Sequence, residues 1–172
     1  MNGLKKKNLI RPADELRENL NFTWLRPRQL AGACQPGAWN PFEKDMELLK
    51  GEGVRVIVNL RERPYILPPK WEGHFDLVHM GMDDFSVPSV EQMDEIVDLA
   101  DSFLEDRKPL VFHCMAGIGR TGVVLAALLM AREGMDARRA IEELAIHGRG
   151  PQSDRQRYFL EKEWAGRLRK KK

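Results

Sequence analysis

Apolar residues along the chain follow two spacings, and segments of one kind alternate with segments of the other. Nearly continuous apolar runs predict three buried strands, at residues 54–60, 75–82 and 109–113. Apolar positions three or four residues apart predict helices, at residues 40–51, 89–106, 136–148 and 153–170. The segment from Arg120 to roughly Ala131 is almost wholly apolar, which indicates a central buried helix.

The N-terminal part shows a different pattern. Residues 21–25 are rich in aromatic and β-favouring residues, and residues 28–33 follow after Pro27, which predicts a short β-hairpin or a pair of edge strands. Asn40 before Pro41 has the pattern of a helix N-cap. Ser89 and Gln92 form a capping box at the start of another helix.

The alternation of strands and helices predicts the fold class. We expect one α/β domain with a central mixed, mostly parallel sheet flanked by helices on both faces. Residues 21–166 are expected to form this domain. Residues 1–20 are then an N-terminal extension, partly helical or flexible, and residues 167–172 a basic C-terminal tail.

Composition excludes several classes of protein. The 172 residues carry a formal net charge of +2, so no nucleic-acid partner is expected. The basic runs at residues 5–7 and 167–172 are expected to be solvated termini. The apolar run at 123–131 is too short to span a bilayer, and the first residues lack the apolar core of a signal peptide. We therefore expect a cytoplasmic monomer with no membrane association.

The stretch HCMAGIGRTG at residues 113–122 combines the features of an anion site with a nucleophile. Cys114 follows a strand at its carboxyl end, where ligands bind in open α/β sheets. The loop glycines allow backbone N–H groups to turn toward one centre, and the helix N-terminus adds its positive end. Arg120 supplies a fork of donors that fits a phosphate. These parts predict a thiolate aimed at a bound oxyanion.

Attack on phosphorus must expel an alkoxide or phenoxide, which a general acid assists. The loop after the strand at 75–82 offers Asp83 and Asp84 on the same side of the sheet as the cysteine. Hydrolysis of the phosphocysteine then needs an oriented water, for which the side-chain amides of Gln152 and Gln156 are candidates.

The string HCMAGIGRTG resembles the His-Cys-(five residues)-Arg-Ser/Thr signature of cysteine-dependent protein tyrosine phosphatases. The acid candidates precede the cysteine by about thirty residues, as in the compact dual-specificity phosphatases, including archaeal and bacterial single-domain members. The resemblance covers roughly residues 20–164. It implies that Cys114 is the nucleophile, that Arg120 binds the phosphate, and that Asp84 is the general acid, with Asp83 as the alternative.

The resemblance also implies supporting roles. Thr121 assists departure of the thiolate, His113 holds the loop, and Gln156 orients the water. The phosphate cradle consists of the backbone N–H groups of six successive residues, namely Met115, Ala116, Gly117, Ile118, Gly119 and Arg120. No cofactor is implied. The scattered histidines His74, His79 and His147 lack the spacing of metal ligands, so we expect no metal site.

The variable loop positions bear on the substrate. Met115, Ala116 and Ile118 are apolar, whereas inositol-lipid phosphatases of this superfamily tend to carry lysines there. The favoured substrate is a phosphoprotein carrying phosphotyrosine, with phosphoserine and phosphothreonine as further candidates. The alternatives are a phosphoinositide or RNA 5′-phosphatase and a non-catalytic phosphate-binding module.

Two further features of the sequence have alternative interpretations. The turn RERPYIL at residues 61–67 either contacts substrate through Arg61, Arg63 and Tyr65 or is a plain surface turn. Cys34 is expected to be a small buried residue, with a redox partner of Cys114 as the alternative.

Overall fold

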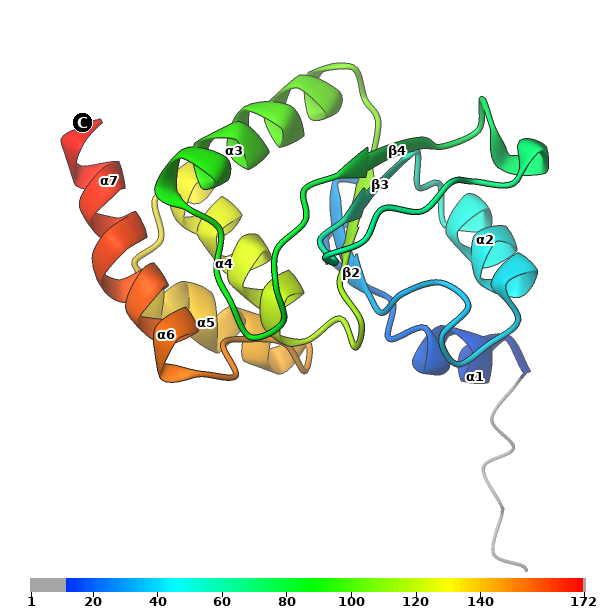
Figure 1. The fold of residues 1–172 in the computed structure, drawn as a ribbon, viewed down its shortest axis with the longest axis horizontal. Coiled ribbons are helices and arrows are strands. Elements are labelled where there is room, and N and C mark those ends of the chain that lie inside the picture. Colours follow the sequence, from blue (N-terminus) through cyan, green and yellow to red (C-terminus); the bar gives the residue numbers. More distant parts are fainter. Residues whose placement is uncertain (1–11, 172) are drawn as a thin grey trace, which may run out of the picture.

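A computed structural model describes residues 12–171 (Figure 1). The centre is a five-stranded sheet with strand order β1-β2-β5-β3-β4. The strands are β1 (Thr23–Arg26), β2 (Leu30–Ala33), β3 (Val56–Asn59), β4 (Asp76–His79) and β5 (Leu110–His113). The β1 and β2 strands pair antiparallel as a hairpin, and every other neighbouring pair is parallel. The predicted mixed, mostly parallel sheet is confirmed.

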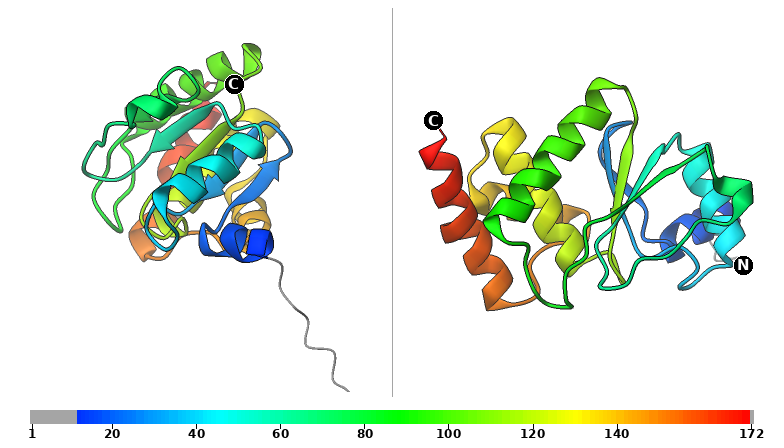
Figure 2. Two further views of the ribbon diagram at one scale, coloured as in Figure 1. Left: turned by 90° about the vertical axis from the view of Figure 1, so that its right-hand side faces the viewer. Right: turned by 45° about the horizontal axis from the view of Figure 1, so that its top comes forward.

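The helices form a layer on each face of this sheet (Figures 1 and 2). One layer holds α1 (Pro12–Asn19) and α2 (Phe42–Gly51). The other holds α3 (Val90–Glu105), α4 (Gly119–Glu133), α5 (Ala137–Ile146), α6 (Asp154–Tyr158), the π-helical turn η2 (Phe159–Trp164) and α7 (Ala165–Lys170). A short 3₁₀ turn, η1 (Pro69–Trp71), precedes β4. The last three helical segments are continuous, as the pattern at residues 153–170 predicts.

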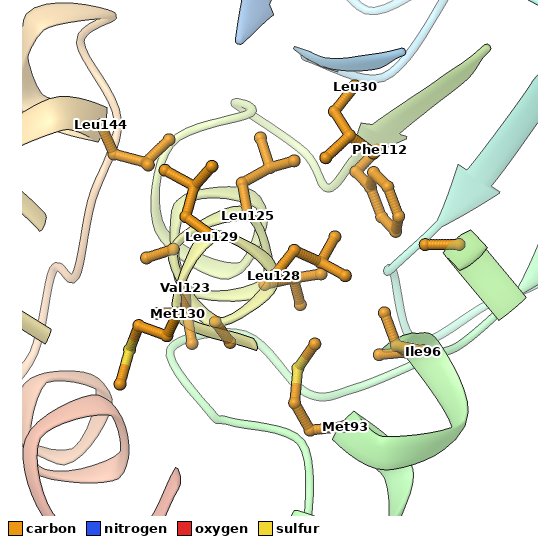
Figure 3. Packing of buried hydrophobic residues seen from close by; sticks show 14 of the residues in the cluster. Leu30, Met93, Ile96, Phe112, Val123, Leu125, Leu128, Leu129, Met130 and Leu144 are labelled. Carbon is orange, nitrogen blue, oxygen red and sulfur yellow. The ribbon is translucent and has the colours of Figure 1, made fainter. Parts of the chain in front are cut away.

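The α4 helix is the centre of the larger core. Every residue from Gly119 to Met130 is buried, so this helix contacts neighbours all round. Its leucines pack against the sheet on one side and against flanking helices on the others, as Figure 3 shows for Leu30, Phe112, Met93, Ile96 and Leu144. Truncating one such buried leucine to alanine costs about 2–5 kcal/mol. This packing fixes the helix whose N-terminus follows the cysteine loop.

Three local predictions are settled by the structure. Ser89 does cap α3, because its hydroxyl accepts a hydrogen bond from the N–H of Gln92 at 3.0 Å. Asn40 does not cap α2, and that prediction is wrong. Its side chain instead donates to the carbonyl of Leu16 and to the carboxylate of Asp45. The expectation of a buried strand at residues 75–82 is also wrong, because β4 lies at the edge of the sheet and is partly exposed.

The topology brings four chain segments to one end of the sheet. Strands β2, β5, β3 and β4 run parallel, so their carboxyl ends meet at the same edge. Four segments continue from these ends, namely residues 34–40, residues 114–118, residues 60–68 and the acid loop at residues 80–88. Within residues 12–171 no helix is both long and apolar enough to cross a membrane. The basic run at residues 5–7 lies outside the described part.

Candidate active site

The cysteine loop, residues 114–118, joins β5 to α4 and lies against the end of β2. Gly117 has a φ of +73°, and a Cβ there would overlap the backbone of Ala33 and Cys34. Only glycine therefore fits this position without moving the neighbouring strand. Cys114 is buried, with 4% of the residue exposed.

The carbonyl groups of this loop are all held from outside it. The Met115 carbonyl accepts from the N–H of Gln35 at 3.0 Å, and that of Ala116 accepts from the side chain of Asn21 at 3.1 Å. The Gly117 carbonyl accepts from Arg149, and that of Ile118 accepts from the N–H groups of Gly122 and Gly150. A trans peptide directs its C=O and N–H in opposite directions. The N–H groups of residues 116–119 consequently point to the inner side of the loop, as an anion site requires.

Arg149 is the buried anchor of this arrangement. Its guanidinium donates to the carbonyls of Gly117, Gly32 and Asn21 and to the hydroxyl of Thr23. These acceptors are uncharged, and burial lowers the pKa of Arg149 to about 10. The residue therefore stays cationic at neutral pH while it ties the cysteine loop to the N-terminal hairpin. No periodicity or motif in the sequence marks it.

Arg120 lies between two carboxylates at the start of α4. Its Nη2 is 3.1 Å from Oδ1 of Asp84, and its Nη1 is 3.1 Å from Oε1 of Glu62. Nη1 also donates to the Met82 carbonyl at 3.0 Å. The Glu62 carboxylate accepts a hydrogen bond from the backbone N–H of Glu62 and lies beside Arg120. These two contacts hold the pKa of Glu62 below its usual range. The sequence indicates candidate contacts in this turn at Arg61, Arg63 and Tyr65, and it misses Glu62.

The two acidic residues of the acid loop lie in different environments. The carboxylate of Asp84 faces Arg120 and accepts from the N–H of Phe85 at 3.0 Å. The carbonyl of Asp83 accepts from the N–H and hydroxyl of Ser86, which forms a turn. Asp84 is thus the acidic side chain that the loop directs toward Arg120.

His113 lies fully buried beneath the cysteine loop. Its Nδ1 is 3.1 Å from the Cys114 carbonyl, which can only accept, so Nδ1 carries the proton. Its Nε2 then accepts from the hydroxyl of Tyr65, also at 3.1 Å. Burial lowers the pKa of His113 to about 4. The imidazole is therefore neutral and supports the loop through the Cys114 carbonyl. The Tyr65 hydroxyl is hydrogen-bonded to His113 within the protein.

The two candidate glutamines differ in how their amides are used. Gln156 is fully buried, accepts from the N–H of Gln152 at 2.7 Å and donates to the carbonyl of Ser86 at 3.1 Å. The side chain of Gln152 lies over Gly119, where an added Cβ would meet its Cδ at 3.1 Å.

A protein-family model described as "Polymorphic toxin system, DSP-PTPase phosphatase" matches residues 31–134, which is more than half of the chain. The chain belongs to this family. It is a dual-specificity-type member of the cysteine-dependent protein tyrosine phosphatase superfamily. The match includes the cysteine loop, the acid loop, strands β3, β4 and β5, and β2 from its second residue on.

Individual relatives of the chain are named phosphatases as well. The mouse dual specificity protein phosphatase CDC14B is 26% identical over 155 residues, which is 85% of this chain and 31% of that protein. The tyrosine-protein phosphatase CDC14 homolog of Schizosaccharomyces pombe is 28% identical over 157 residues, covering 83% and 29%. The chain thus spans about a third of the length of these curated relatives.

Solved structures show the same fold. The crystal structure of Tk-PTP in its active form has a TM-score of 0.71 and 25% identity, covering 88% of this chain and 98% of that one. PTPMT1 in complex with PI(5)P has a TM-score of 0.72 at 18% identity, covering 87% and 97%. At that identity, the second likeness concerns the fold alone.

Two further residues complete the description of the site. The hydroxyl of Thr121 is buried and has no hydrogen-bond partner among the described residues. Cys34 is a free buried thiol, and burial raises its pKa to about 11. Its sulfur lies 3.5 Å from the carbonyl of Asn19. Residues 12–171 contain no group of His, Cys, Asp and Glu side chains arranged to hold a metal ion.

Proposed function

We propose that this protein hydrolyses phosphomonoesters of phosphoproteins through a phosphocysteine intermediate, with phosphotyrosine as the favoured substrate. The observation that carries the proposal is the cysteine loop, whose carbonyls are bound from outside while its N–H groups face inward around the nucleophile. Such a cradle is preorganised, so it stabilises the charge of a transferring phosphoryl group without reorganisation. The loop therefore supports phosphoryl transfer rather than simple burial of a thiol.

In the first step, the phosphate binds between the loop N–H groups and Arg120, and the Cys114 thiolate attacks phosphorus. The S–P bond forms as the ester P–O bond breaks, and Asp84 gives its proton to the departing oxygen. Arg120 already lies 3.1 Å from Asp84, so the two groups that must meet the substrate are neighbours. Neutral His113 holds the loop and takes no proton.

In the second step, water attacks phosphocysteine and the S–P bond breaks. The Asp84 carboxylate takes a proton from the water, and the thiolate leaves with inorganic phosphate as the product. The unpartnered hydroxyl of Thr121 is proposed to donate to the departing sulfur. No metal or cofactor takes part in either proposed step.

The test is turnover of para-nitrophenyl phosphate and phosphotyrosine peptides by the wild-type protein and by Cys114→Ser. We expect turnover by the wild type, inhibition by vanadate, no effect of EDTA, and no turnover by the variant. Equal rates for the two proteins, or no turnover by either, contradict the proposal. The second result favours a non-catalytic phosphate-binding module.

The substrate class is tested separately with a panel. The loop side chains Met115, Ala116 and Ile118 offer no charge to additional phosphates, so phosphopeptides are expected to be turned over faster than phosphoinositides or 5′-triphosphate RNA. Faster phosphate release from the lipid or the RNA would assign the enzyme to that substrate instead. We also propose a cytoplasmic monomer, which two free thiols support. Light scattering and cell fractionation test these two points.

A further inference from the structure

Gln156 connects two loops that belong to different halves of the proposed reaction. Its Nε2 donates to the carbonyl of Ser86, which lies in the acid loop two residues after Asp84. Its Oε1 accepts from the backbone N–H of Gln152, in the segment beside the start of α4. The side chain is fully buried, so water does not compete for either hydrogen bond. One amide thus fixes the relative positions of both segments.

The helix turn that carries Gln156 also holds the acid loop a second time. Ser153 caps α6 by accepting from the N–H of Gln156 at 3.2 Å, and its hydroxyl lies 3.4 Å from the carbonyl of Phe85. Two consecutive carbonyls of the acid loop are therefore bound by this turn. Phe85 has a φ of +57°, a left-handed conformation that costs a side-chain-bearing residue about 1 kcal/mol. The external hydrogen bonds offset that cost and keep Asp84 turned toward Arg120.

The other end of the connection concerns water. Each polar atom of Gln156 already binds one backbone group, and the side chain is fully buried, so Gln156 joins these segments and is not exposed to a water in the site. The Gln152 side chain makes no hydrogen bond to the described residues and lies over Gly119, at the border of the cradle. The side-chain amide of Gln152 is therefore free of partners among the described residues. Gln156 holds the backbone N–H of Gln152 and so fixes the point from which that side chain extends.

We propose that Gln156 is a positioning residue for both steps. Through Ser86 it fixes the loop that presents Asp84, and through the N–H of Gln152 it fixes the amide that orients the hydrolytic water. This inference rests on the proposed function. Of the two glutamines that the sequence offers for orienting the water, it assigns that role to Gln152, whereas the family resemblance implies Gln156.

The experiment compares Gln156→Met, which keeps the volume and removes both hydrogen bonds, with Gln152→Ala, which keeps the acid-loop connection. Arg157→Met is the matched control, because Arg157 is exposed on the same helix. Rapid mixing measures phenol release and inorganic phosphate release separately, for phenyl phosphate and for para-nitrophenyl phosphate. Amide hydrogen exchange of residues 81–88 measures the order of the acid loop without turnover.

For Gln156→Met we expect phenol release to slow by about 10–100-fold with phenyl phosphate and by less with the better leaving group. Phosphate release should slow as well, and the acid loop should exchange at least about tenfold faster. Gln152→Ala should slow phosphate release alone. The control should match the wild type in every measurement.

Equal slowing for both leaving groups would overturn the inference, since a general loss of folded enzyme predicts that result. Unchanged exchange in the acid loop would overturn it as well, because the loop would then keep its order without Gln156. A Gln152→Ala variant that slows phenol release equally overturns the division of roles. A wild-type protein without turnover contradicts the proposed function, and the exchange measurement then decides the Gln156 inference by itself.

Discussion

The hydroxyl of Tyr65 donates to Nε2 of His113 over 3.1 Å, which joins the segment after β3 to the floor of the cysteine loop. Both groups are largely inaccessible to water, and burial raises the pKa of Tyr65 as it lowers that of His113. A neutral hydroxyl therefore meets a neutral imidazole. The imidazole is held at both ring nitrogens, by the Tyr65 hydroxyl at Nε2 and by the Cys114 carbonyl at Nδ1.

Replacing Tyr65 by phenylalanine should lower the free energy of unfolding by about 1–3 kcal/mol, because it leaves a buried acceptor without a donor. Urea unfolding measures the change. Tyr158→Phe is the control, since Tyr158 is exposed and should change the free energy by no more than about 0.5 kcal/mol. Similar values for the two variants would show that the bond to His113 contributes nothing.

Acidification should destabilise the protein through His113. Its pKa is about 4 in the folded state and about 6.5 when unfolded, so between these values the unfolded state binds more protons. The contribution of neutral His113 to the free energy of unfolding is fully present above about pH 6.5. It falls as the pH is lowered toward 4, by up to about 3 kcal/mol in total. Urea unfolding at several pH values measures the slope, and His147→Asn should retain it. An NMR signal of His113 that titrates near pH 6.5 in the native protein contradicts this account.

Asp84→Asn should slow turnover of phenyl phosphate by about 10²–10⁴-fold, as expected for loss of a general acid. It should also strengthen binding of inorganic phosphate, because the Asp84 carboxylate no longer opposes an anion at Arg120. Asp83→Asn is the matched comparison in the same loop. If the loss of rate follows Asp83 instead, the assignment of the acid is wrong.

Gly117→Ala should lower the free energy of unfolding by about 2–5 kcal/mol, from the left-handed φ and the overlap with the β2 backbone. Gly134→Ala separates the two causes, because Gly134 has a similar φ of +67° and open space around its Cβ position. The control should therefore lose only the conformational part, about 1–2 kcal/mol. Calorimetry of both variants measures the difference.

Arg149→Met should abolish phosphate binding even in a Cys114→Ser background, because the Gly117 carbonyl loses its outer donor. Arg149→Lys should recover little, since an ammonium does not reproduce the fork that reaches separate carbonyls. Isothermal calorimetry with inorganic phosphate measures the binding. Normal affinity in the methionine variant would show that the loop keeps its shape without this anchor.

The cysteine loop was predictable because its parts are contiguous in sequence. Cys114, the glycines and Arg120 lie within seven residues, and a strand and a helix on either side place them without distant contacts. The sheet was predictable for a similar reason, except at β4, where a run of apolar residues forms an exposed edge strand. Burial on each face depends on neighbours that a local pattern does not specify.

The outer support of the loop was not predictable in the same way. Arg149 and Asn21 are 128 residues apart in sequence and meet only because the hairpin lies beside β5. Glu62 looks like any charged residue in a surface turn until Arg120 lies beside it. Asn40 has the local pattern of a helix cap, but tertiary partners at Leu16 and Asp45 take its side chain.

The hydrogen bonds to the carbonyls of the cysteine loop bear on how such a protein changes over evolutionary time. Apart from Arg120, the groups proposed to bind phosphate belong to the main chain of the cysteine loop, and most of the donors that hold its carbonyls come from other segments. The side chains at positions 115, 116 and 118 carry none of these bonds, so they are free to be exchanged. Substrate preference can drift at these positions while the chemistry is inherited intact.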